Sequence, residues 1–218
     1  FIDYDERAVV SVQESRKESD FPFYSVNLRD PDSDSELAID ITKAVGYPIL
    51  LMNTRDVGEA KISLNKAGEI AKDFLKKQNY TSMELFESTQ YDSVGLFNFV
   101  YTENGVRVYT DSIKVKVALD NGGVIGYSAE EYLKTNKERD IKEPELSFEE
   151  VKSKVSPKLK IMENRLAVIA DTRGEEVLCY EILGLLNDET YRIFVNADNG
   201  EEVLIEKMDE SEPAYENL

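Results

Sequence analysis

The sequence predicts an α+β protein made of tandem modules, each a helix packed on a small antiparallel sheet of about four strands. Two recurring patterns carry this prediction. A strand–turn–strand pattern contains Asp-Asn-Gly at 120–122 and again at 198–200, and Asn-Gly readily supplies the positive φ angles that tight hairpin turns require. A helical pattern precedes each of these hairpins, starting near Leu64 and near Phe148. The repeated order of elements predicts related modules.

The first module, residues 1–60, is predicted to contain strands but no helix. Alternating patterns predict strands at 8–13 and 23–28, and residues 37–41 followed by 46–50 repeat the strand–turn–strand ending. The covering helix would lie before Phe1. A sheet without its helix exposes an apolar face. We therefore expect residues 1–60 to pack this face on the second module or against another chain, for example in a homodimer.

The second module, residues 61–139, is predicted to open with an amphipathic helix. Its apolar positions, which recur at helical spacing, are Leu64, Ala67, Ile70, Ala71, Phe74 and Leu75. Strands are then expected at 83–90, 96–101, 113–117 and 124–127. A short helix at 128–133 should lead into a charged linker at 134–145.

The third module, residues 140–208, is predicted to open with a helix that begins at a capping box, Ser147 with Glu150. The helix's apolar stripe would consist of Phe148, Val151, Val155 and Leu159. Pro157 should kink or end it, because proline lacks the amide proton of an interior position. Strands are expected at 165–170, 176–186, 191–195 and 203–205. The acidic tail, 209–218, is expected to be disordered.

The charge balance disfavours nucleic acid as a partner. The chain has 218 residues, 44 of them acidic and 26 basic, for a formal net charge of −18. Nucleic-acid binding draws most of its affinity from Lys and Arg on phosphates. The charge is uneven, since residues 140–218 alone carry 9 basic and 20 acidic residues, a net of −11. Such a field would speed association with a basic protein surface.

The residue types leave little room for catalysis. The chain has no His, which excludes Ser-His-Asp and Cys-His mechanisms and imidazole metal sites. The single cysteine, Cys179, lies in an apolar stretch and is predicted to be a buried hydrophobe. Carboxylate pairs such as Glu175 and Glu176 are expected by chance in so acidic a chain and have no specificity for sugar hydrolysis. We expect no enzyme activity, no catalytic residue, no metal site and no cofactor.

The segment Asp30–Glu36 resembles a calcium loop because carboxylates alternate along it. An EF-hand loop requires Gly at its sixth position and Glu at its twelfth, where this sequence has Ser35 and Ile41. A solvated loop between two strands is the preferred interpretation. Weak cation binding at Asp30–Glu36 stays open.

Tyrosines are spread through the predicted strands and their ends. Most are expected to be half-buried with the hydroxyl at the surface, and a few would serve as anchors for a protein partner. The sequence does not single out those few. The candidates are Tyr47, Tyr91, Tyr101, Tyr109, Tyr127, Tyr132, Tyr180 and Tyr191.

The module of helix, strands and closing Asp/Asn-Gly hairpin resembles the PepSY domain. Five stretches also resemble, more specifically, the C-terminal PepSY region of the YpeB family of spore germination proteins, and the resemblance runs from about Phe23 to Met208. The stretches are 39–43, 46–49, 59–65, 111–122 and 146–151.

This resemblance implies a non-enzymatic accessory protein of the spore envelope. Members of the family are partners of a cortex-lytic cell-wall hydrolase, SleB, which the PepSY region is thought to restrain and stabilise until germination. It also implies a place on the cortex side of the inner membrane, as the soluble part of a membrane-anchored protein. The longest aliphatic run, Ile49–Met52, is far below the roughly 20 residues that span a bilayer. An alternative is an envelope module that is structural or senses a ligand, binding peptidoglycan or cations.

Overall fold

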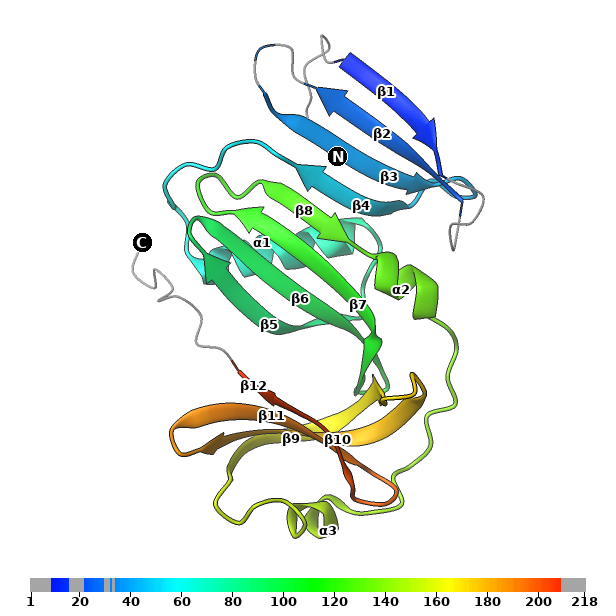
Figure 1. The fold of residues 1–218 in the computed structure, drawn as a ribbon, viewed down its shortest axis with the longest axis vertical. Coiled ribbons are helices and arrows are strands. Elements are labelled where there is room, and N and C mark those ends of the chain that lie inside the picture. The colour runs from blue at the N-terminus through cyan, green and yellow to red at the C-terminus, as the bar shows by residue number, and fades with distance from the viewer. Residues whose placement is uncertain (1–8, 16–21, 30–31, 33, 209–218) are drawn as a thin grey trace. The chain divides into compact units, whose positions relative to one another are not determined.

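A computed structural model describes residues 9–15, 22–29, 32 and 34–208. In this part of the chain there are twelve strands and three helices (Figure 1). The chain divides into two compact units, and the described residues of unit 1 come from 1–99 and 112–135. Unit 2 takes residues 100–111 and 136–210. The predicted disordered tail, 209–218, lies outside the described residues.

Unit 1 begins with an antiparallel meander of four strands, in which each strand pairs with the next. The strands are β1 (Val9–Glu14), β2 (Phe23–Arg29), β3 (Glu36–Thr42) and β4 (Pro48–Asn53). The sequence predicted all four to within a few residues, from apolar residues that alternate with polar ones in the first three strands or form a short continuous run in β4, bounded by turn residues.

The second part of unit 1 combines two helices with four more strands, two of which extend into the residues of unit 2. Helix α1 begins at Ser63, whose side chain accepts a hydrogen bond from the Lys66 amide. Strand β8 pairs with both β7 and β4, so the meander continues edge to edge into this sheet. The elements are α1 (Leu64–Lys77), β5 (Met83–Tyr91), β6 (Val94–Glu103), β7 (Val106–Ala118), β8 (Val124–Ser128) and α2 (Glu130–Thr135).

The core of unit 1 lies between α1 and one face of this sheet (Figure 1). Phe74 of α1 meets Tyr127 of β8 edge to face, with 5.4 Å between ring centroids. Leu37 and Leu51 of the first meander belong to the same core cluster. Part of the expected apolar face of residues 1–60 is therefore buried in the core that contains α1.

Unit 2 contains a second antiparallel meander, in which β10 pairs with β9 and β11, and β11 with β12. The first residues of β7 also pair with β9 in parallel, matching Arg107 with Ala167. This parallel pair, which the sequence did not predict, makes the sheet mixed. The elements are α3 (Phe148–Lys152), β9 (Lys160–Ala170), β10 (Glu176–Leu186), β11 (Glu189–Asn196) and β12 (Glu202–Lys207).

Helix α3 is shorter than its predicted apolar stripe. The capping box of Ser147 and Glu150 is present, but the helix ends at Lys152. Val155 and Leu159 are nevertheless buried in the same core cluster as Val151. The apolar pattern therefore identified the buried residues correctly, while the chain before Pro157 leaves the helix early.

Three hairpins, β3–β4, β7–β8 and β11–β12, share one turn geometry. In each, a glycine with φ between 71° and 77° donates its amide to the carbonyl four residues earlier. The three glycines are Gly46, Gly122 and Gly200. Each hairpin also has a register shift just before its turn. The repeat of the strand–turn–strand pattern is thus present in the backbone.

The predicted α+β class holds in a strand-rich form, since the described residues are mostly in strands and few are helical. The division into modules at 1–60, 61–139 and 140–208 stays a prediction. Among the described residues, no helix has the length and apolar character that crossing a bilayer requires.

Candidate functional site

The described part of unit 2 contains a groove of about 540 Å³, lined by residues 137–143, by Glu145 and by strand and turn residues of the sheet. Val168 of β9, Leu178 of β10 and Ile141 supply apolar surface. The exposed carboxylates along it are those of Glu138, Asp140, Glu143, Glu145 and Asp198. Two exposed lysines, Lys137 and Lys142, also line it, so the groove combines an apolar lining with a rim that is acidic on balance.

An ion-pair network fixes the start of the segment that forms this groove. The Arg139 guanidinium donates to both carboxylate oxygens of Asp111, each at 2.8 Å, and to Glu176 at 2.7 Å. The Asn136 side-chain amide donates to Asp111 at 2.7 Å. The Asp111 side chain is fully buried and that of Arg139 is 5% exposed. The predicted charged linker is therefore held in place rather than free.

The network shifts the titration of its charged groups. Hydrogen bonding from Arg139 lowers the pKa of Glu176 to about 2, helped by hydrogen bonds from Lys137 and Thr110. Burial alone would lower the pKa of Arg139, but its hydrogen bonds to Glu176 and Asp111 outweigh burial and raise it. Glu176 is thus ionised at neutral pH and serves as a structural acceptor.

The far end of the groove segment is held by backbone hydrogen bonds. The Leu146 amide donates to the Ala197 carbonyl at 2.9 Å. The Tyr180 hydroxyl donates to the Leu146 carbonyl at 2.9 Å. Between the two ends, Ile141 packs on Val106, Val108 and Val168. Both ends and the middle of the segment are therefore anchored to the sheet.

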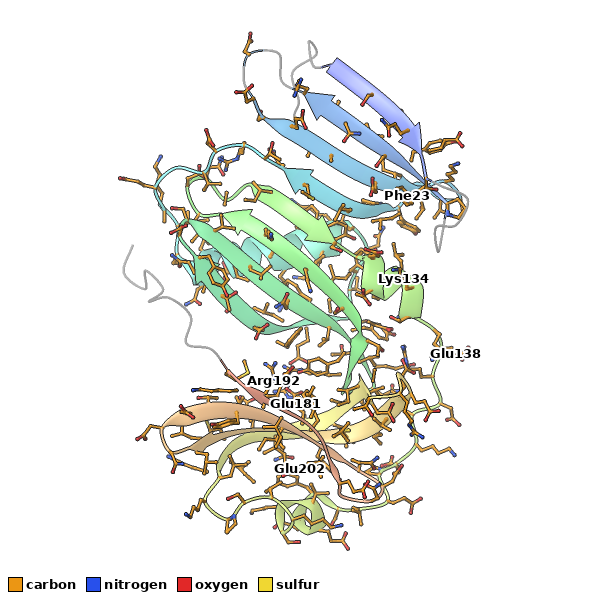
Figure 2. The ribbon with its side chains drawn as sticks, in the orientation of Figure 1. Phe23, Lys134, Glu138, Glu181, Arg192 and Glu202 are labelled. Carbon is orange, nitrogen blue, oxygen red and sulfur yellow. The ribbon has the colours of Figure 1, made fainter. Side chains whose placement is uncertain are left out.

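A second network is buried on the face of the unit 2 sheet that points away from α3. Glu181 accepts hydrogen bonds from Arg107 at 2.9 Å and from the Tyr109 hydroxyl at 2.8 Å. Arg192 lies 3.4 Å from the same carboxylate. Figure 2 shows Glu181 and Arg192 on this face, and all three charged side chains are no more than 8% exposed. Burial is the first cause that raises the pKa of Tyr109, so its hydroxyl stays protonated.

Unit 1 has its own carboxylate-centred network, at the β7–β8 turn. Arg55 donates to both oxygens of Asp120, at 2.9 and 2.7 Å, and the Gly58 amide donates to the same carboxylate at 3.0 Å. Hydrogen bonding from Arg55 lowers the pKa of Asp120 to about 2. The contact ties the loop before α1 to the turn.

These arrangements stabilise structure, and none is poised for catalysis among the described residues. Burial raises the pKa of the Cys179 thiol to about 12, so it is not an activated nucleophile. The described residues contain no group of three or more His, Cys, Asp and Glu side chains that could hold a metal ion. The two carboxylates with strongly lowered pKa values, Glu176 and Asp120, each form an ion pair with an arginine.

The sequence candidates fall in different places. Glu176 belongs to the network at the groove, whereas Glu175 is exposed and lies 2.8 Å from Arg173. Asp30, Pro31 and Ser33 of the calcium-like segment lie outside the described residues, and its last residue, Glu36, pairs with Arg29. Cation binding there stays a prediction.

The tyrosine candidates do not gather into one patch. Tyr47 and Tyr91 are exposed, at 47% and 61%, and are the best placed to anchor a partner. Tyr127 and Tyr180 are buried in core clusters. The half-buried members are Tyr101, Tyr109, Tyr132 and Tyr191.

Sequence reasoning missed Arg107, Arg139, Glu181 and Arg192. A charged residue in an alternating strand pattern is expected to face solvent. The one available signal was Glu181, the only charge between Val177 and Leu186 in an otherwise apolar strand. A lone carboxylate in such a run requires a buried cationic partner.

The described residues define a strand-rich α+β protein, and comparison with known proteins assigns its family. Residues 1–142 match the family model described as "YpeB sporulation, PepSY1 and PepSY2 domains". The chain belongs to this YpeB sporulation family, as its resemblance to the YpeB C-terminal PepSY region predicted.

Individual relatives support the assignment. The chain is 45% identical over 216 residues to "Sporulation protein YpeB" of Halalkalibacterium halodurans, covering 99% of this chain and 48% of the relative. Identity to the Bacillus subtilis protein of the same name is 40% over 216 residues, 98% of this chain and 48% of the relative. The structure titled "Bacillus megaterium YpeB C-terminal domain" aligns with a TM-score of 0.87 and 43% identity, covering 94% of this chain and 91% of that one. The chain spans about half the length of its curated relatives.

Proposed function

We propose that this chain is the partner-binding region of a non-enzymatic accessory protein that restrains and stabilises a SleB-like cortex-lytic hydrolase in the spore. Membership of the sporulation family, at 40–45% identity across nearly the whole chain, is the observation that carries the proposal. The networks described above support the non-enzymatic part, because their carboxylates are committed to arginines. The chain would act on the cortex side of the inner membrane.

We further propose that the chain is organised as three tandem PepSY-like modules, at 1–60, 61–139 and 140–208. The shared geometry of the turns at Gly46, Gly122 and Gly200 supports this division. In the second and third modules the residue before the helix N-cap also donates to an equivalent carbonyl, Ile62 to Leu119 and Leu146 to Ala197.

The groove in unit 2 is the candidate contact for the hydrolase. Its acidic rim lies in the region of highest negative charge, residues 140–218, with a net of −11. This field would steer a basic surface of the partner, while the apolar lining would supply affinity, because exposed ion pairs contribute only about 0–1 kcal/mol each. Raising salt to about 0.5 M should then slow association more than it speeds dissociation. Deleting 209–218 should have little effect.

A charge-reversal pair tests the groove. Glu138→Lys changes the rim, and Glu202→Lys makes the same charge change on β12, outside the groove lining; both glutamates are labelled in Figure 2. Association with the purified hydrolase, followed by stopped flow at low salt, should slow severalfold for Glu138→Lys and much less for Glu202→Lys. Equal slowing of association by the two variants would contradict a role for the groove. Binding that does not depend on salt would contradict electrostatic steering.

Co-purification decides between the two functions. The chain should retain the hydrolase from a spore extract, lower its activity on cortex peptidoglycan and release no reducing sugar alone. Retention by isolated cortex peptidoglycan without the enzyme would favour the alternative, an envelope module that is structural or senses a ligand. Hydrolysis that disappears with one carboxylate substitution would contradict the non-enzymatic assignment.

A further inference from the structure

We infer that the outer apolar face of β1 and β2 is the docking seat for an amphipathic helix supplied by the part of the longer protein that precedes residue 1. The inference concerns the fold of unit 1 and does not depend on the identity of the hydrolase. The proposed helix would cover the part of the first meander that α1 leaves exposed.

The uncovered face is continuous with the face that α1 covers. Directly paired residues of antiparallel strands share a face, and the register joins one row across six strands. Exposure falls along the row from 59% at Val12 to 1% at Leu51 and 2% at Tyr127. Val10, in the neighbouring row, is 57% exposed. The row consists of Val12, Val26, Ile39, Leu51, Tyr127 and Val115.

The first meander also has the backbone carbonyl to which the start of each covering helix is hydrogen-bonded in the other two hairpins. The residue before each N-cap donates its amide to the second residue of the turn: Ile62 to the Leu119 carbonyl at 3.0 Å and Leu146 to the Ala197 carbonyl at 2.9 Å. The equivalent turn residue in the first meander is Lys43, since Thr42 accepts from Gly46 as Ala118 does from Gly122. No backbone amide of the described residues donates to the Lys43 carbonyl.

The spacing along the chain places the missing helix upstream. The N-cap Ser63 precedes the first residue of β5, Met83, by 20 residues, and the N-cap Ser147 precedes the first residue of β9, Lys160, by 13. The same separation counted back from Val9 falls before residue 1. The curated relatives are about twice as long as this chain, and the chain aligns with a structure titled as a YpeB C-terminal domain. Relatives of this family therefore have upstream chain that could supply a helix.

The turn residue that would accept the helix start differs in the first meander from its equivalents in the other two hairpins. Leu119 and Ala197 are fully buried beneath their helices, whereas Lys43 is a cation that lies 2.8 Å from Glu14 and 4.9 Å from the centroid of the Tyr24 ring. Positive charge beside a helix N-terminus is unfavourable unless it is neutralised. The Glu14 carboxylate supplies that neutralisation, so the seat can still receive a helix start.

Thiol labelling of the full-length protein tests the inference. Val12→Cys places a thiol on the proposed seat, and Ser11→Cys places one on the next residue of β1, exposed on the opposite face. In the full-length protein we expect Val12→Cys to react at least about tenfold more slowly than Ser11→Cys, because a docked helix must open before the reagent can enter. In the 218-residue chain the two should react at similar rates. Cys179 is fully buried and adds little background.

Hydrogen exchange provides a second measurement that distinguishes loss of helix docking from misfolding of a variant. A segment upstream of residue 1 should be protected in the full-length protein, and Val12→Asp should remove that protection while Ser11→Asp keeps it. Equal labelling of the two thiols in the purified full-length protein would overturn the inference. So would protection that rises with protein concentration, which indicates a second copy, or protection that appears only when another protein is added.

Discussion

Asp120 in unit 1 and Glu181 in unit 2 each hold an arginine from a distant part of the sequence, but their surroundings differ. Asp120 lies at a turn, where its side chain is 14% exposed and that of Arg55 is 24% exposed. Glu181 lies in the middle of β10, where its side chain and those of Arg107 and Arg192 are all between 5% and 8% exposed.

The difference separates two uses of an ion pair. At the turn, water can solvate either partner if the other is removed, so the contact serves mainly to position a loop. In the sheet, two guanidinium groups share one buried carboxylate, and removing that carboxylate leaves like charges in a low dielectric. The same chemistry should therefore stabilise the two units by different amounts.

The largest effect is expected for Glu181→Ala. It should lower the free energy of unfolding of unit 2 by about 3–5 kcal/mol, because Arg107 and Arg192 lose their shared counter-charge while still buried. Asp120→Ala should lower the stability of unit 1 by about 1.5–3 kcal/mol, the range for hydrogen bonds to charged groups. Hydrogen exchange of the β11 and β7–β8 amides reports the two units separately.

An apolar replacement sharpens this test. Changing Arg107, Glu181 and Arg192 together to Met, Leu and Met should recover most of the stability that Glu181→Ala loses, because no buried charge remains. If the triple variant is as unstable as Glu181→Ala, packing rather than charge explains the loss.

The two networks also differ in how far the sequence predicts them. The turn at 120–122 was predicted from Asp-Asn-Gly, a local signal that sets the backbone by itself. The partner of Asp120, Arg55, lies 65 residues away, and no local pattern identifies it. Glu181 lies in a strand whose bounds, 176–186, were predicted correctly, yet alternation alone would place its side chain in solvent.

The reason lies in tertiary pairing. The parallel contact between β7 and β9 brings Arg107 and Tyr109 over the sheet face that carries Glu181. Hairpins are encoded by neighbouring residues, whereas this pairing joins residues about 60 positions apart. The groove was not predicted for the same reason. The many charges of residues 134–145 suggested a solvent-exposed linker, whereas Arg139 holds this segment on the sheet by pairing with Asp111 and Glu176.

The next largest effect is expected at Arg139, which holds the groove segment on the sheet through Asp111. Arg139→Ala should destabilise unit 2 by about 3 kcal/mol, because the fully buried Asp111 loses its bidentate cation. It should also release residues 136–147, so trypsin should cut after Lys137 and Lys142 faster than in the parent protein. Lys142→Ala, at the exposed rim of the groove, is the control and should leave stability unchanged within about 0.5 kcal/mol. Unchanged proteolysis in Arg139→Ala would contradict this role of Arg139.

Acid should weaken both units through their lowered carboxyl pKa values. Asp120 and Glu176 titrate near pH 2 when folded, against ordinary values of 3.8 and 4.5. A lowered folded pKa gives stability that is fully present above the unfolded pKa and is lost as the pH falls towards the folded one. Stability should therefore decline between about pH 5 and pH 2. Asp120→Asn should flatten this decline in unit 1 only, and Glu176→Gln in unit 2 only, as followed by urea unfolding at each pH.

The smallest effect compares the starts of α1 and α3. Ser147 is part of a reciprocal capping box: its hydroxyl accepts a hydrogen bond from the Glu150 amide at 3.4 Å, and its amide and hydroxyl donate to the Glu150 carboxylate at 2.9 and 2.7 Å. The Ser63 hydroxyl accepts a hydrogen bond from the Lys66 amide at 3.2 Å, but the third helical residue, Lys66, has no carboxylate to accept a bond in return. Helix α3 has five residues and α1 has fourteen, so α3 has fewer internal bonds to compensate for a lost cap. Ser147→Ala should therefore lower the local stability of its helix by about 1 kcal/mol and Ser63→Ala by about half as much. Hydrogen exchange of the first protected amide in each helix measures both, and a larger loss for Ser63→Ala would contradict both the capping argument and the helix-length argument.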